Sequence, residues 1–93
     1  MTNIDVIKKK SKYIIDMNGH SGDSEICASV STLTAALEGW LKNSDLKYSY
    51  IEGKGVARIE APTAAKEAVE VFLIGAMRLE KNFPENIRVK IHE

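Results

Sequence analysis

The chain has 93 residues, which fits a single domain over residues 1–93. Thirteen basic side chains balance thirteen acidic ones, so no strong net field exists to attract nucleic acid or an anionic membrane. No apolar stretch approaches the ~20 residues that span a bilayer, and residues 1–10 carry charge where a signal peptide is apolar, so we expect a cytoplasmic protein.

The pattern of apolar residues predicts two strands and then a helix. Alternation indicates strands over residues 4–7 and 13–17. The lysine-rich segment between them is either a solvated hairpin tip or a contact with nucleic acid or a ribosome. A helix is predicted over residues 24–42, because apolar residues recur there with helical spacing. Its expected buried stripe is Ile26, Val30, Leu33, Leu37, Trp40 and Leu41.

The next two strands are predicted to form a hairpin, over residues 46–52 and 55–61. Gly53 suits the first central position of a two-residue type II′ turn, where φ is positive. The cross-strand pairs that follow from this turn are Tyr50 with Ala57 and Lys47 with Glu60.

A second helix is predicted over residues 63–82, with Thr63 as its cap, and a last strand over residues 87–91. Apolar residues occur on more than one side of this helix. Either both sides are buried in the monomer, or one side contacts a partner. The main stripe is Ala65, Val69, Phe72, Ala76, Leu79 and Phe83, and the residues off it are Val71, Ile74 and Met77. The order ββαββαβ predicts an α+β domain with two helices packed on a mostly antiparallel five-stranded sheet.

The residues that carry chemistry lie between the second strand and the first helix. A thiol attacks a carbonyl as the thiolate, which a helix N-terminus and a neighbouring imidazole both favour. Cys27 lies in the first helical turn, and His20 lies in the loop before it. With Ser24 as the N-cap, Cys27 is the third helical residue and its backbone N–H stays unpaired. The N–H groups of Cys27 and Ala28 are then candidate oxyanion donors.

The position of Cys27 around the helix favours a reactive thiol. At 100° per residue it lies roughly a quarter turn from the centre of the apolar stripe, and Ser31, one turn later, points the same way. A lone Cys on a helix also suits a small buried hydrophobe. Asp16 and Asp23 are both near enough in sequence to orient His20, and Asp23 is also a good N-cap residue.

We expect no metal and no cofactor. One Cys and two distant His do not supply the ligands of a structural zinc site. His92 is the other candidate base, but it lies next to the C-terminus, where we expect it to be solvated.

This stretch resembles the signature of the ribosomal-processing cysteine protease (Prp) family. That signature is Gly-His, a short variable loop, and then Cys-Ala-x-Val-Ser at the start of a helix. The matching residues here are Gly19, His20, Cys27, Ala28, Val30 and Ser31. The loop between His and Cys is shorter than in better-known members, and Ser24 stands where they carry Asp, with Asp23 one residue earlier.

The resemblance implies a homodimeric cysteine endopeptidase with Cys27 as nucleophile and His20 as base. Such enzymes remove a short N-terminal extension from a large-subunit ribosomal protein, and phage or mobile-element relatives would process a different precursor. The implied partners are a peptide segment of the substrate and a second copy of the chain, without a membrane or specific nucleic acid. The alternative is a non-catalytic dimeric adaptor that binds a peptide or a ribosomal surface. The supporting or substrate-binding residues implied are Gly19, Asp23, Ser24, Ala28 and Ser31.

Overall fold

The computed structural model describes residues 1–19 and 22–92 and confirms the α+β fold. The elements follow the predicted order ββαββαβ, with a short 3₁₀ turn before the second helix. Their bounds are β1 (Thr2–Lys8), β2 (Lys12–Asn18), α1 (Ser24–Asn43), β3 (Ser49–Gly53), β4 (Val56–Pro62), the 3₁₀ turn (Thr63–Ala65), α2 (Lys66–Asn82) and β5 (Ile87–His92). No helix within these ranges is long and apolar enough to cross a membrane.

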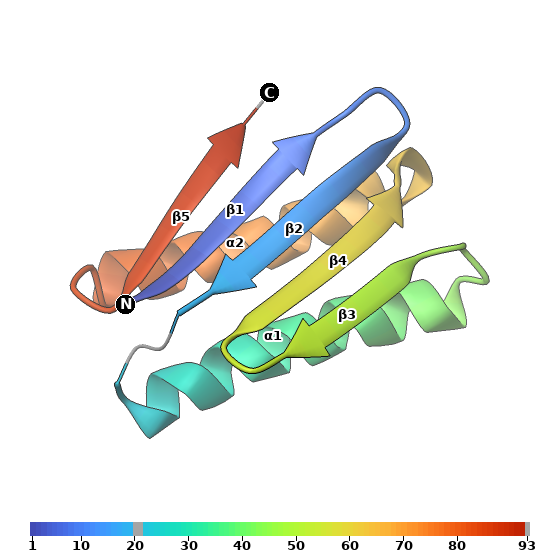
Figure 1. The fold of residues 1–93 in the computed structure, drawn as a ribbon. Helices are drawn as coiled ribbons and strands as arrows, with labels where there is room; N and C mark the ends of the chain where they lie inside the picture. The colour runs from blue at the N-terminus through green and yellow to red at the C-terminus, as the bar shows by residue number, and fades with distance from the viewer. Residues whose placement is uncertain (20–21, 93) are drawn as a thin grey trace.

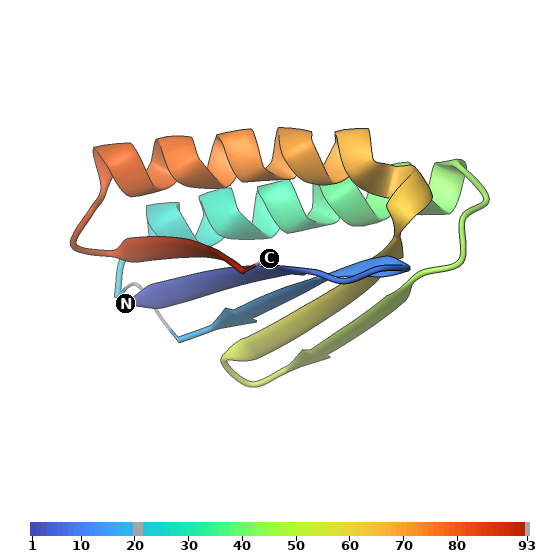
Figure 2. The same ribbon diagram turned by 90° about the horizontal axis from the view of Figure 1, so that it is seen from above.

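The five strands form one sheet in the order β3-β4-β2-β1-β5 (Figure 1). Neighbouring strands are antiparallel except β1 and β5, which run parallel, so the sheet is mostly antiparallel as predicted. Both helices cover the same face, and the molecule has two layers (Figure 2). Every side chain on a strand therefore points either toward the helices or toward the open face.

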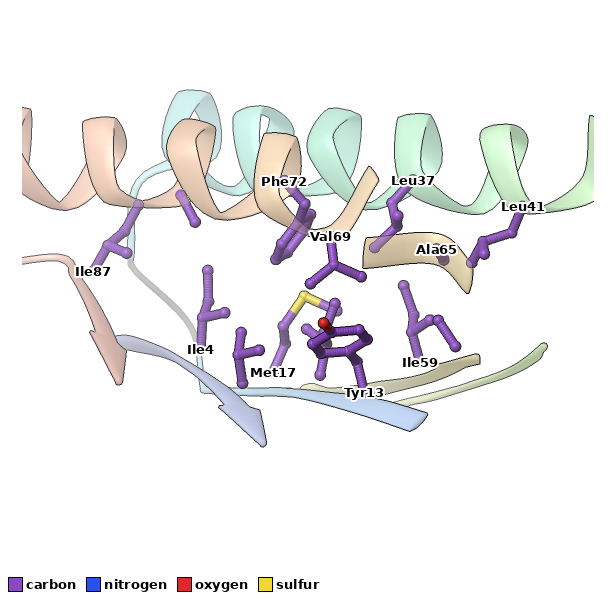
Figure 3. Packing of buried hydrophobic residues seen from close by; sticks show 14 of the residues in the cluster. Ile4, Tyr13, Met17, Leu37, Leu41, Ile59, Ala65, Val69, Phe72 and Ile87 are labelled. Atoms are coloured by element: carbon purple, nitrogen blue, oxygen red, sulfur yellow. The ribbon is translucent and has the colours of Figure 1, made fainter. Parts of the chain in front are cut away.

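The core lies between the helices and the sheet (Figure 3). Alternate strand residues such as Ile4, Ile15 and Ile59 point into it and are fully buried. Val69 and Phe72 of α2 pack against them, as the predicted stripe requires. A five-stranded sheet covered on one side thus provides the interior of this short chain.

Trp40 was expected in the buried stripe of α1, but its side chain is 42% exposed. The stripe is centred on Ile26, Leu37 and Leu41, which are all buried, and Trp40 lies at its edge. There the indole lines a groove between α1 and α2, together with Val71. The 3.6-residue period predicts which side of a helix is buried, but packing against the neighbouring element decides where that side ends.

The hairpin turn lies one residue further along the chain than predicted. Gly53 pairs with Val56, so the central residues of the turn are Lys54 and Gly55. Gly55, in the second central position, has the left-handed φ of +74°. This is the requirement of a type II turn, and the type II′ prediction is wrong.

The change of turn moves the strand register by two residues. Tyr50 therefore opposes Ile59, and the predicted pairing of Lys47 with Glu60 is wrong. Glu60 opposes Ser49 instead, and its carboxylate forms a hydrogen-bonded ion pair with Lys12. Because side chains alternate with a period of two, this shift keeps every residue on its predicted face.

The second helix begins differently from the prediction. Thr63 opens the 3₁₀ turn, and within the described residues no side-chain hydrogen bond caps either that turn or α2. The prediction of a Thr63 cap is therefore wrong. The backbone N–H of Lys66 donates to the carbonyl of Thr63 instead, so the 3₁₀ turn leads the chain into the helix.

Candidate active site

Asp23 is the residue that starts α1. Its backbone is extended, and its carboxylate accepts hydrogen bonds from the N–H groups of Glu25 at 2.9 Å and Ile26 at 3.3 Å. The cap therefore lies one residue before Ser24, which is the first helical residue. An N-cap aspartate satisfies free helical N–H groups and places a negative charge at the positive end of the helix dipole.

The cap changes what the backbone offers near Cys27. The Cys27 N–H donates to the carbonyl of Asp23 at 3.0 Å, so the prediction that this N–H is unpaired is wrong. In regular helix geometry the N–H of Ala28 is likewise directed at the carbonyl of Ser24. These two N–H groups are therefore engaged in the helix and do not form a ready oxyanion site.

The thiol of Cys27 lies at the border of the core. Its neighbour Ile26 is 3% exposed and packs into the core, whereas Cys27 is half-buried. This agrees with the position expected from the helical period. A thiol that is partly exposed near a helix start can meet a substrate carbonyl without the helix having to unwind.

Gly19 directs the chain out of β2. Its φ is +89°, and a Cβ built at this position would lie 2.2 Å from the backbone carbonyl oxygen of Met1. Its N–H donates to the carbonyl of Gly55 at 3.0 Å, which ties the end of β2 to the hairpin turn. Glycine is therefore required here by the backbone alone, whatever role its neighbours have.

The predicted base, His20, and the adjacent Ser21 lie outside the described residues. Of the two acidic candidates that were expected near it, Asp23 caps α1. Asp16 is on the open face of the sheet, 3.7 Å from the guanidinium of Arg58. His92 also lies on that face, where its Nε2 is 2.9 Å from Asp5. The sheet separates Asp16 and His92 from α1, so neither is beside Cys27.

A groove between α1 and the β3–β4 hairpin begins one helical turn from Cys27. Ser31 lines it, together with Glu38 from the same helix and Tyr50 and Glu52 from β3. From the sequence, we paired Tyr50 with Ala57 across the hairpin and assigned nothing to the two glutamates. Their spacing in the sequence indicates which residues lie together. Glu38 and Ser31 share one side of the predicted helix, and Tyr50 and Glu52 share one face of the predicted strand. Among the described residues, no group of three or more His, Cys, Asp or Glu side chains gathers to hold a metal ion.

These features define a two-layer α+β domain with a half-buried thiol at the start of its first helix. No family model and no curated protein matches the sequence. Solved structures share the fold. A protein from Streptococcus mutans is 24% identical, with a TM-score of 0.78, and the match covers 99% of this chain and 94% of that one.

The same fold is found in the essential ribosomal processing protease Prp from S. aureus. Its complex with a substrate peptide matches with a TM-score of 0.84 at 16% identity. Its complex with a covalently linked product peptide matches with a TM-score of 0.83 at 18% identity. Each match covers 98% of this chain and 99% of the other. The fold is therefore that of Prp structures over almost the whole chain.

Proposed function

We propose that this protein is a cysteine endopeptidase of the Prp type, with Cys27 as nucleophile and His20 as base. The observation that carries the proposal is the half-buried thiol in the first turns of α1, on a fold whose solved examples include protease–peptide complexes. The Gly19-His20 and Cys27-Ala28-x-Val30-Ser31 pattern supports it.

In this mechanism, His20 takes the thiol proton and Cys27 Sγ attacks the scissile carbonyl carbon. The imidazolium then gives its proton to the leaving amine, and a thioester joins the first product to Cys27. His20 removes a proton from water, the hydroxide attacks the thioester, and the acid is released as the thiol is restored. The helix dipole at the start of α1 favours the thiolate before it attacks and again when it leaves the acyl group.

The substrate we propose is the precursor of a large-subunit ribosomal protein that carries a short N-terminal extension, or a phage-type precursor. The site of action is then the cytoplasm, where ribosomes assemble. The test is to incubate the protein with such precursors and to measure product masses. We expect one cut near the N-terminus by the natural protein and none by the Cys27→Ala variant. Binding of the precursor without cleavage by the natural protein would instead indicate a peptide-binding adaptor.

We also propose that the protein acts as a homodimer. The outer side of α2 exposes 66% of Val71, 64% of Ile74 and 49% of Met77, and Trp40 of α1 lies beside Val71 in the groove between the helices. Adjacent exposed apolar side chains of this size are typical of a protein contact. A second copy that packs on this side would bury them.

A further inference from the structure

The groove between α1 and the β3–β4 hairpin lies on the same side of the molecule as the start of α1. Figure 2 shows the tip of the hairpin curving away from the helix layer. Residues of both hairpin strands line the groove. Its floor is formed by small or apolar residues, including Val30, Ala35 and Ala57. It is open to solvent rather than an enclosed cavity.

The groove follows the side of α1 that carries Cys27. At 100° per residue, the groove residues Ser31, Thr34 and Glu38 lie within about 40° of Cys27 around the helix axis. At 1.5 Å per residue, Ser31 is about 6 Å and Glu38 about 16 Å further along that axis. An extended peptide rises about 3.3 Å per residue. If such a peptide is cut at Cys27 and runs along α1, its residues about two to five positions from the scissile bond lie in the groove.

The charged residues that line the groove are Glu38 and Glu52, and both are acidic. Glu52 accepts a hydrogen bond from the hydroxyl of Tyr50 at 3.0 Å. Burial raises the pKa of Tyr50 most, and the hydrogen bond to Glu52 and the charges of Glu52 and Glu38 raise it further. Both carboxylates therefore influence the same group, the Tyr50 hydroxyl. In the described part of the chain no basic residue lines the groove, and no ion pair neutralises either glutamate.

The groove is lined by residues of β3, which is the edge strand of the sheet. Among the residues that the structure describes, β3 pairs only with β4. Part of its backbone N–H and C=O groups therefore have no ladder partner and can pair with another extended chain. This feature points to a peptide as the occupant, and the acidic lining favours a basic one over a nucleic acid.

We propose that this groove is a specificity subsite that accepts a Lys or Arg side chain, about two to five residues from the bond that Cys27 cleaves. The subsite rests on the proposed peptidase function. Glu38 and Glu52 bind the cationic side chain, and the edge of β3 holds the peptide backbone. The substrates are then extended segments that carry a basic residue close to the cut.

The first test measures cleavage of a randomised peptide library by mass spectrometry. Each pool fixes Lys, Gln or Glu at one position, and the pools together cover the positions on both sides of the cut. We expect the natural protein to cut pools with Lys at one or more of these positions about three- to tenfold faster than pools with Gln, and to disfavour Glu. The double variant Glu38→Gln with Glu52→Gln should lose this preference, whereas Glu67→Gln with Glu85→Gln, which removes the same charge from exposed sites outside the groove, should keep it.

The second test separates the subsite from the peptidase activity. The Cys27→Ala variant is titrated with fluorescein-labelled Lys and Gln pools, and fluorescence anisotropy reports binding. We expect tighter binding of the Lys pools, weakened by salt and by the Glu38→Gln and Glu52→Gln changes. Equal binding and equal cleavage of both pools would overturn the subsite even if the protein is a peptidase. Lys-selective binding without cleavage by the natural protein would overturn the peptidase and leave the groove as a binding site for basic peptides.

Discussion

At the scale of single residues, Cys27 lies beside Ile26, and the two side chains have different surroundings. Ile26 is 3% exposed, and Cys27 is half-buried at the border of the core. We therefore expect Cys27→Ala to lower the free energy of unfolding by less than about 1 kcal/mol, and Ile26→Ala to lower it by about 2–5 kcal/mol. Thermal denaturation measures both. A large loss of stability in Cys27→Ala would identify this thiol as a core residue.

A second prediction at this scale concerns the role of His20 as base. If His20 takes the proton of Cys27, then His20→Ala should slow alkylation of Cys27 by iodoacetamide at near-neutral pH, because less thiolate is present. His92→Ala is the matched control, since His92 contacts Asp5 on the other face of the sheet and should leave the rate unchanged. Equal rates in all three proteins would remove His20 from the proposed mechanism.

At the scale of elements, the hairpin turn can be tested by two glycine substitutions. Gly55 has a left-handed φ of +74°, which costs an alanine about 1–2 kcal/mol. Gly53 lacks a left-handed φ, and a Cβ there would meet Val56 at an ordinary 3.4 Å. Gly55→Ala should therefore reduce stability in urea denaturation, and Gly53→Ala should have little effect. If Gly53→Ala instead reduced stability more than Gly55→Ala, the result would support the predicted type II′ turn.

The ion pair between β2 and β4 gives the sheet a dependence on pH. The hydrogen bond from Lys12, with the charges of Lys12 and Arg58, holds the pKa of Glu60 below its ordinary value of 4.5. A lowered pKa in the folded state means that the pair stabilises the protein above that ordinary value and loses its effect as the pH falls through the lower folded pKa. Glu60→Gln should therefore be less stable than the natural protein at neutral pH, and the difference should close in acid. Glu85→Gln, in an exposed turn, serves as the control in the same denaturation series.

At the scale of the whole molecule, two helices on one face of the sheet leave the outer side of α2 without a neighbour within the described residues. We expect sedimentation at micromolar concentration to detect a dimer. Ile74→Glu should shift it to a monomer, because a charge in an apolar interface has no partner. Glu85→Gln, in the exposed turn after α2, should leave the dimer intact. A dimer that resists Ile74→Glu would mean that another surface mediates assembly.

The sequence by itself determined the order and type of the elements and the side of each that is buried. Those properties follow from the spacing of apolar residues within one segment, every second residue in a strand and every three or four in a helix. Ile4, Ile15 and Phe72 belong to such patterns. The same periods placed Cys27 at the edge of the buried side of α1.

Only the tertiary structure decided how distant segments meet. A period of two cannot distinguish registers that differ by two residues, so Tyr50 opposes Ile59 rather than Ala57, and Glu60 pairs with Lys12 rather than Lys47. The acidic groove also depends on contacts between distant segments. Glu38 and Glu52 come from different elements and share a groove only because the hairpin packs beside α1. Local pattern describes one element at a time, whereas a binding site is made from the contacts between elements.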